Sequence, residues 1–401
     1  MPNRTPDDVT YARPATLRDV AEACGVSITA VSLTLRGCPT RFSEETKARI
    51  RETAVTLGYD PERSQGARRL VMRRFKQYVL NHLVAVCLPA EFYRAQYYTT
   101  AFKGIVDVLN EQGFGVLIID AGNPTARLFP PILQRGDVDG MITLLGAGDY
   151  RRIEEQLRAT PSFRQRPIVS LLTALPGVTP VLADAAAGAK AEVAHLLALG
   201  HRHFLYFRQP QGVPVGVHQD QLYPGYRQAC LEAGLDPEAH LIPAEIDPAL
   251  LRFAFMADNV QQITLLNALQ PGLPALPAAS WSRYRRLLRQ HPQITAILAP
   301  NDATAITLRY HLALDGKRVP EDYSLVGFDD TDPLLDAHGQ TNTLTTVRLP
   351  LRTLGQKAAR LLVEQLNGKH AKPQRIIVPT KLIVRTSTAP VQASARGLPP
   401  R

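Results

Sequence analysis

The chain has 401 residues and carries 46 lysines and arginines against 36 aspartates and glutamates, so its formal net charge is +10 at pH 7. The length predicts two or three domains, and a hydrophobic fraction of 45% allows a large buried core. The basic balance favours a polyanionic partner. No apolar run reaches the roughly 20 residues that a membrane-spanning helix needs, so we expect no membrane partner.

Residues 1–14 are polar and proline-bearing, and we interpret them as a tail rather than a signal peptide. The cysteines show neither metal-ligand spacing nor a disulfide-dense pattern, which suits a reducing compartment; they are Cys24, Cys38, Cys87 and Cys230. We therefore expect a cytoplasmic protein without a bound metal or cofactor.

Residues 15–60 predict three short helices. Thr16, followed three residues later by Asp19, is typical of a capping box that begins the first helix. Gly25 permits a sharp turn because it lacks a Cβ atom, and Ser27 can cap the second helix. In the third helix we expect three inward residues, which are Ile50, Ala54 and Leu57. Helix, tight turn and helix is the helix-turn-helix pattern, whose second helix enters the DNA major groove. A small helical bundle is the alternative.

The segments DVAEACGVSITAVSLTLRG and SEETKARIRETAVTLGY resemble the DNA-binding head of the lactose/galactose repressor (LacI/GalR) family in length, order and spacing. This resemblance implies a homodimeric transcriptional regulator that associates with the nucleoid and binds a palindromic double-stranded DNA operator. A repressor is the expected direction of control, although the sequence leaves an activator open.

The resemblance also implies which residues touch DNA. The family reads bases with the positions occupied by Ile28, Thr29 and Leu33. Ile28 and Leu33 are apolar, so they would contact thymine methyl groups rather than donate hydrogen bonds; core packing is the alternative for both. The candidate phosphate contacts are Thr16, Ser27 and Ser32.

Residues 61–80 are expected to form a basic hinge or linker. The run RSQGARRLVMRRFK contains no acidic residue. The family's hinge pushes a leucine into the minor groove, and Leu70 matches it, although two residues late. Arg68 and Arg69 would add phosphate contacts. A hinge that binds mainly by charge, and a merely solvated linker, both stay open.

Residues 81–390 alternate short apolar runs with helical patterns. LVAVCLP, GVLIID, GMITLL, PIVSLL, HFLYF, AILAP, YSLVGF and RIIVP are the expected strands. Strands separated by helices indicate an α/β fold with parallel sheets covered on both faces. The stretch 241–280 fits this pattern poorly, and we interpret it as an insertion with one helix. Residues 391–401 would form a tail.

The resemblance extends over this core. VAHLLALGHRHFLYF, TAILAPNDATA, RVPEDYSLVGFDDTD and LTTVRLPLRTLGQKAARLLVEQLNG resemble the family's effector-binding core, which has the two-lobed type I fold of periplasmic sugar-binding proteins. It implies a first lobe of about 81–200 and 332–368 and a second of about 201–331 and 369–390. A small-molecule effector, a saccharide by this resemblance, would bind between them.

The same resemblance nominates effector-binding residues. Asp302, in PNDATA, matches the aspartate that binds sugar hydroxyls, with a helix N-cap as the alternative. Tyr97 and Tyr98 match an aromatic pair that stacks on the ligand ring, with core packing as the alternative. Trp281 lies near another ring-stacking position. Gln221 is the candidate replacement for an arginine that relatives place where this chain has Leu222.

Two other functions stay open. One is a small-molecule-binding protein without specific DNA recognition. The other is an α/β hydrolase or phosphotransferase that acts through the acids of DDTD, Asp329 to Asp332, which the family resemblance makes a loop near the lobe crossover. The chain contains no G-x-S-x-G elbow, Walker loop or H-E-x-x-H motif, so we expect no enzyme.

Overall fold

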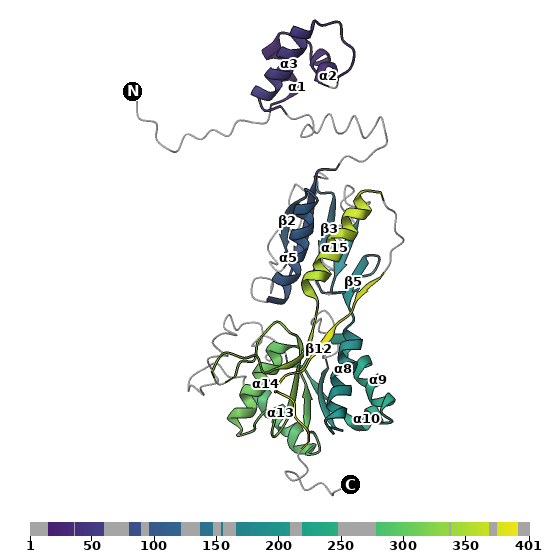
Figure 1. Ribbon diagram of the computed structural model, residues 1–401, viewed down its shortest axis with the longest axis vertical. Coiled ribbons are helices and arrows are strands. Elements are labelled where there is room, and N and C mark those ends of the chain that lie inside the picture. Colours follow the sequence, from purple (N-terminus) through teal and green to yellow (C-terminus); the bar gives the residue numbers. More distant parts are fainter. Residues whose placement is uncertain are drawn as a thin grey trace, which may run out of the picture. The chain divides into compact units, whose positions relative to one another are not determined.

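The computed structural model describes residues 15–35, 37–59, 80–89, 96–121, 137–146, 154, 166–208, 219–247, 278–336, 338–368 and 375–391. The chain divides into two compact units, Met1–Leu80 and Asn81–Arg401 (Figure 1). The three hinge candidates, Arg68, Arg69 and Leu70, lie outside the described residues.

The first unit contains the three predicted helices, α1 (Leu17–Cys24), α2 (Ile28–Leu35) and α3 (Glu44–Thr56). Both halves of the predicted capping box are present at Thr16, and Gly25 has a left-handed φ of 63°. The core of this unit contains Val20, Ala21, Cys24, Val31, Ile50, Ala54 and Tyr59.

One predicted core residue of the head is wrong. Leu57 is 41% exposed, because α3 ends at Thr56 and Leu57 is already its C-cap. The chain then turns at Gly58, whose φ is +67°, and Tyr59 enters the core instead. A left-handed glycine at this position is a common helix ending.

The second unit contains two six-stranded sheets, each the centre of one lobe. The first has the order β11-β5-β4-β3-β1-β2 and is parallel throughout. Its strands are β1 (Leu83–Leu88), β2 (Gly115–Asp120), β3 (Gly140–Thr143), β4 (Ile168–Leu171), β5 (Thr179–Ala183) and β11 (Ile376–Val378). Central strands such as β1 are almost wholly buried, as expected for a sheet with both faces covered.

The second sheet has the order β12-β10-β9-β8-β6-β7, and only the β10–β12 pair is antiparallel. Its strands are β6 (Phe204–Arg208), β7 (Leu241–Glu245), β8 (Ala296–Leu298), β9 (Ser324–Asp329), β10 (Thr345–Arg348) and β12 (Lys381–Ile383). The predicted parallel α/β fold is therefore confirmed.

Helices cover both sheets. They are α5 (Gln96–Glu111), α8 (Ala185–Ala198), α9 (Gln219–Glu232), α10 (Pro237–His240), α13 (Ala278–Gln290), α14 (Asp302–Leu314) and α15 (Leu351–Leu366). In the first lobe, α15 lies beside α5 (Figure 1). Gly104 of α5 lies so close to α15 that an added Cβ would meet the Arg352 carbonyl oxygen at 2.1 Å.

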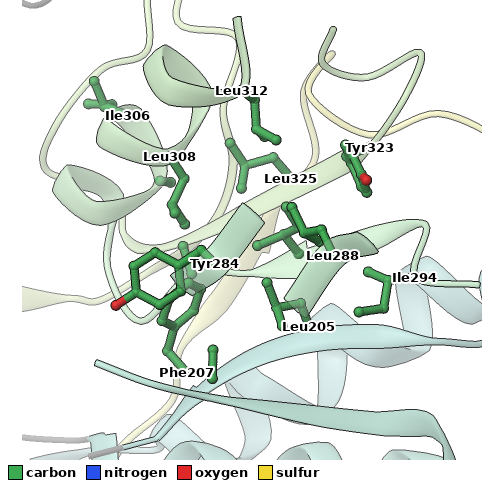
Figure 2. Packing of buried hydrophobic residues seen from close by; sticks show 14 of the residues in the cluster. Leu205, Phe207, Tyr284, Leu288, Ile294, Ile306, Leu308, Leu312, Tyr323 and Leu325 are labelled. Carbon is green, nitrogen blue, oxygen red and sulfur yellow. The ribbon is translucent and has the colours of Figure 1, made fainter. Parts of the chain in front are cut away.

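A large apolar cluster fills the second lobe between its sheet and the helices α13 and α14. Figure 2 shows its central members, with Leu205 and Phe207 from β6, Tyr284 and Leu288 from α13, and Leu325 from β9. The cluster includes residues of β8 and β9, and the carboxyl ends of these strands lead to the candidate site residues Asp302 and Asp329.

The pairing of the strands corrects the predicted lobe boundaries. Helix α8 packs on α9, β10 and β12, so it belongs to the second lobe rather than the first. Strand β10 is likewise in the second sheet, and β11 is in the first. The chain therefore crosses between lobes at 183–185, 348–351 and 378–381. The sequence did not locate these points because the strands that flank them, β5, β10 and β11, are short and their sheet is fixed only by their partners.

The predicted insertion at 241–280 is also corrected at its ends. Its first five residues form β7, which pairs in parallel with β6, and residues 278–280 begin α13. Residues 248–277 lie outside the described part of the chain. Among the described helices, none combines the length and the apolar character that crossing a membrane requires.

Candidate functional site

The N-terminal part of α2 is exposed on the head. The Ser27 hydroxyl accepts a hydrogen bond from the amide of Ala30 at 3.2 Å, so Ser27 caps α2 as predicted. Ile28 is 42% exposed, and Thr29 is exposed as well. Both side chains are available to a partner, whereas Val31 is fully buried.

The other predicted DNA contacts of the head are Ser32 and Leu33 of α2 and Thr16 at the start of α1. Ser32 and Leu33 are half-buried, one turn after the exposed pair. Thr16 is exposed at the start of α1, where its amide and hydroxyl both donate to the Asp19 carboxylate. Because Ile28 is exposed, core packing does not account for it. An exposed apolar side chain at the start of a second helix suits contact with thymine methyl groups.

Asp302 is not an open ligand group. It begins α14 directly after Asn301, the N-cap, and is 1% exposed. Its carboxyl group accepts from the amide of Thr331 at 2.9 Å, from that of Asp332 at 3.4 Å, and is hydrogen-bonded to the Thr346 hydroxyl. Burial is the main reason that the pKa of Asp302 lies well above its ordinary value. The carboxyl group is thus an internal anchor for the loop after β9, and its predicted contact with an effector stays a prediction.

Asp329 lies at the end of β9 beside this anchor. It is half-buried and has a φ of 108°, which is left-handed backbone that non-glycine residues rarely adopt. Desolvation raises the pKa of Asp329 well above its ordinary value, and the carboxyl groups of Asp302 and Asp332 raise it further. An acid directly after a buried strand, at the carboxyl edge of a parallel sheet, was the signal in the sequence for this position.

Tyr97 is a predicted effector contact from the first lobe. It lies in the first turn of α5, is 9% exposed, and packs edge-on against Tyr98 with ring centroids 5.0 Å apart. Burial raises the pKa of Tyr97 well above its ordinary value, and the nearby Asp329 carboxyl group raises it further. The Asp329 carboxyl group of the second lobe is therefore near enough to the Tyr97 hydroxyl of the first lobe for its charge to act on it.

Trp281 belongs to the hydrophobic core. It is 5% exposed within the apolar cluster of the second lobe, and its ring lies 4.9 Å from that of His311. Its indole N–H donates to Asp315 at 2.9 Å. Asp315 caps the end of α14, whereas Asp302 begins that helix, so Trp281 lies far from Asp302. The structure therefore favours a core role for Trp281, and its predicted ring-stacking role stays a prediction.

Gln221 lies half-buried on α9, next to the fully buried Leu222. Leu222 contributes an apolar side chain to the lobe interior, so no cation stands at this position. Asp184, at the first lobe crossover, caps α8 by accepting from the amide of Ala187 at 3.1 Å. Among the described residues, no three His, Cys, Asp or Glu side chains are grouped as metal ligands would be.

Comparison with known proteins agrees with both units. The head matches the family model "Bacterial regulatory proteins, lacI family" over residues 16–62, and the core matches "Periplasmic binding protein-like domain" over residues 193–388. The HTH-type transcriptional regulator CelR of Thermobifida fusca is 28% identical, covering 94% of this chain and 98% of the relative. The ribose operon repressor of Halalkalibacterium halodurans is 26% identical, covering 93% and 97%.

Solved structures share the fold. A LacI family transcriptional regulator from Enterococcus faecium with bound ribose is 25% identical, with a TM-score of 0.55, and the match covers 77% of this chain and all of the other. The lac repressor dimer bound to operator is 20% identical, with a TM-score of 0.58, and the match covers 94% of this chain and all of the other.

A helix-turn-helix head followed by a two-lobed binding core defines a class, the ligand-responsive DNA-binding regulators. Both parts match known families in the expected order. The chain combines a DNA-binding domain of the lacI family with a periplasmic-binding-protein-like domain, and it is a DNA-binding transcriptional regulator.

Proposed function

We propose that the protein is a cytoplasmic homodimeric repressor that binds a palindromic operator through two copies of α2. The observation that carries this proposal is the exposed start of α2, where Ile28 and Thr29 project outward while Val31 holds the helix to its core. Base contacts would come from Ile28, Thr29 and Leu33, and phosphate contacts from Thr16, Ser27 and Ser32. Two heads that must dock together make affinity depend on their spacing.

A selection of random double-stranded DNA with purified full-length protein tests this proposal. We expect one enriched two-fold sequence, and we expect the variant I28A to select a different or weaker motif. A flat sequence profile would instead support a small-molecule-binding protein without specific DNA recognition. Size measurement in the same buffer should give a dimer.

We propose further that a small polar effector, a saccharide, binds between Tyr97 and Asp329. A carboxyl group can hydrogen-bond to sugar hydroxyls, and an aromatic ring can pack on the apolar face of a sugar. Tyr98 would support the ring of Tyr97, with Gln221 as a further polar contact. Two relatives support a sugar, one named for the ribose operon and one with ribose bound. We propose no catalysis by the core.

Thermal-shift screening of mono- and disaccharides, including ribose and cellobiose, tests the effector site. We expect at least one sugar to stabilise the wild type and D329N to lose that stabilisation. D302N is the matched control, since Asp302 lies adjacent but its carboxyl group is occupied internally. A sugar shift lost in D302N and retained in D329N would return the role to Asp302.

A further inference from the structure

Asp330 is held between two arginines. Arg348 Nε donates to one carboxylate oxygen at 2.6 Å, and Arg385 Nη2 donates to the other at 2.7 Å. The Asp330 side chain is 6% exposed, and that of Arg385 is 18% exposed. Arg385 also donates to the Leu344 carbonyl oxygen at 2.6 Å. A carboxylate with both oxygens in charge-assisted hydrogen bonds is fixed in direction as well as in charge.

This clamp acts on a backbone that is unfavourable for its residues. Asp329 and Asp330 have φ angles of 108° and 56°, so two consecutive aspartates adopt left-handed conformations. Such conformations persist only where surrounding contacts enforce them, and they cluster at functional sites. The two arginines supply that enforcement at Asp330, and Asp302 supplies it at the next residue by accepting from the amide of Thr331.

The clamped turn is also bonded to a lobe crossover. Arg348 is the last residue of β10, and the chain then crosses to α15 of the first lobe. At this crossing the amide of Leu349 donates to the Asp329 carbonyl oxygen at 3.3 Å. The main chain of Asp329 therefore holds the crossover, while its carboxyl group acts electrostatically on Tyr97. Arg385 extends the contact to the segment after the third crossing, just beyond β12.

The geometry points to Asp330 as a positioning residue. Held by Arg348 and Arg385, it fixes the turn that carries Asp329 and ties that turn to the crossover between the lobes. This inference rests on the proposed function, because Asp329 is an effector contact only there. Asp330 itself touches no ligand in this scheme. It converts a contact made at Asp329 into a constraint on the segment that connects the lobes.

Hydrogen exchange of the full-length protein without ligand tests the inference. The amide of Leu349 is the reporter, since its bond to Asp329 lies in the turn. We expect D330N and R348Q to raise its exchange rate about tenfold, as expected when a charge-assisted contact that closes a local structure is removed. R348K, which keeps the charge, should restore most of the protection. Arg348 is 54% exposed, so its replacement does not empty the core.

Two variants separate positioning from a merely structural role. D330G places a residue that tolerates a φ of 56° at that position, so it relieves the backbone but removes the clamp. We expect D330G to unfold at no lower temperature than D330N and still to lose protection at Leu349. D107N is the matched control, because Asp107 pairs with Arg352 at 2.7 Å within the first lobe. It should leave Leu349 exchange unchanged.

The inference and the proposed function fail in different ways. Equal exchange at Leu349 in D330N, D330G and D107N overturns the inference, whatever the sugars do. A wild type that no sugar stabilises counts against the effector site, with the exchange results standing by themselves. D329N should separate the two roles, because it keeps the main-chain bond and the protection at Leu349 but loses the sugar response.

Discussion

Glu192 of α8 and Tyr226 of α9 lie against each other in the interior of the second lobe, with exposed fractions of 0% and 1%. Burial raises the pKa of Glu192 well above its ordinary value, and Asp302 adds to the effect, while the Tyr226 hydroxyl partly offsets it. The folded protein therefore keeps Glu192 neutral at a pH where the unfolded chain would ionise it.

The pH dependence of stability should change in E192Q. The folded state binds the proton more tightly, so the contribution of Glu192 is complete below about pH 4.5 and declines as pH rises toward the folded pKa. Glutamine cannot ionise. We expect E192Q to be more stable than the wild type by about 1 kcal/mol or more at neutral pH and similar to it near pH 4.5.

Urea unfolding at several pH values measures this difference. E232Q is the control, because Glu232 is exposed on the same helix pair and its bonds to Lys190 and Gln228 lower its pKa. E232Q should be no more stable than the wild type at neutral pH. Parallel curves for E192Q and the wild type would contradict the argument.

Asp302 should tolerate asparagine but not alanine. Because burial raises the pKa of Asp302 well above its ordinary value, we expect an amide to replace its carboxyl group, with the oxygen accepting from Thr331 and Asp332 and the nitrogen donating to the Thr346 hydroxyl. D302A leaves those buried groups without partners, so we expect a loss of about 2–4 kcal/mol in unfolding free energy. Equal loss in D302N and D302A would show that the ionised form is needed.

A methyl group added at either of two close helix–helix contacts should destabilise the fold. An added Cβ at Gly104 would meet the Arg352 carbonyl oxygen at 2.1 Å, and one at Gly225 would meet that of Ala186 at 2.2 Å. G104A and G225A should each cost about 2–4 kcal/mol, because backbone cannot move aside cheaply. G115A, whose Cβ would have its nearest contact at 3.4 Å, is the control and should be near neutral. Thermal unfolding of the three variants decides.

The two faces of α2 should respond in opposite ways to truncation. I28A should leave the unfolding free energy within about 0.5 kcal/mol of the wild type and weaken operator binding by about 1–2 kcal/mol. V31A should lower stability by about 1–3 kcal/mol, because Val31 is fully buried. Circular dichroism melts and binding to the selected DNA distinguish the two, and stability loss in I28A would contradict an outward-facing residue.

Trp281 should matter for stability and not for ligand. W281F keeps most of the apolar volume but loses the indole bond to Asp315, and Arg285 still pairs with that carboxylate. We expect a loss of about 1–2 kcal/mol in unfolding free energy. The sugar-induced thermal shift should stay as in the wild type, in contrast to D329N. A lost shift in W281F would restore the predicted ring-stacking role.

The head was predictable from the sequence almost residue by residue, because caps and turns are local. Thr16, Gly25 and Ser27 act within a few residues of themselves, and each is found in its expected role. Leu57 was misplaced because the direction of the last turn depends on where Gly58 ends the helix.

The core site was harder to predict because its residues meet only after long chain crossings. Local spacing marks Asp302 as a helix start but does not reveal that the loop after β9 folds back onto it. The burial of Trp281 depends on its contact with Asp315, the C-cap of α14, and no local sequence pattern shows that these two residues meet. The predicted lobe boundaries were wrong for the same reason, since only the neighbouring strands show which sheet β10 and β11 belong to.

The last strands have a consequence for synthesis. β11 completes the edge of the first sheet and β12 the edge of the second, only a few residues apart in the chain. Neither lobe is therefore whole on the ribosome until the final part of the message has been translated. A stop codon or frameshift upstream of Ile376 would leave both sheets with an open edge at once, which makes the damaged product a target for aggregation and proteolysis rather than a working half-receptor.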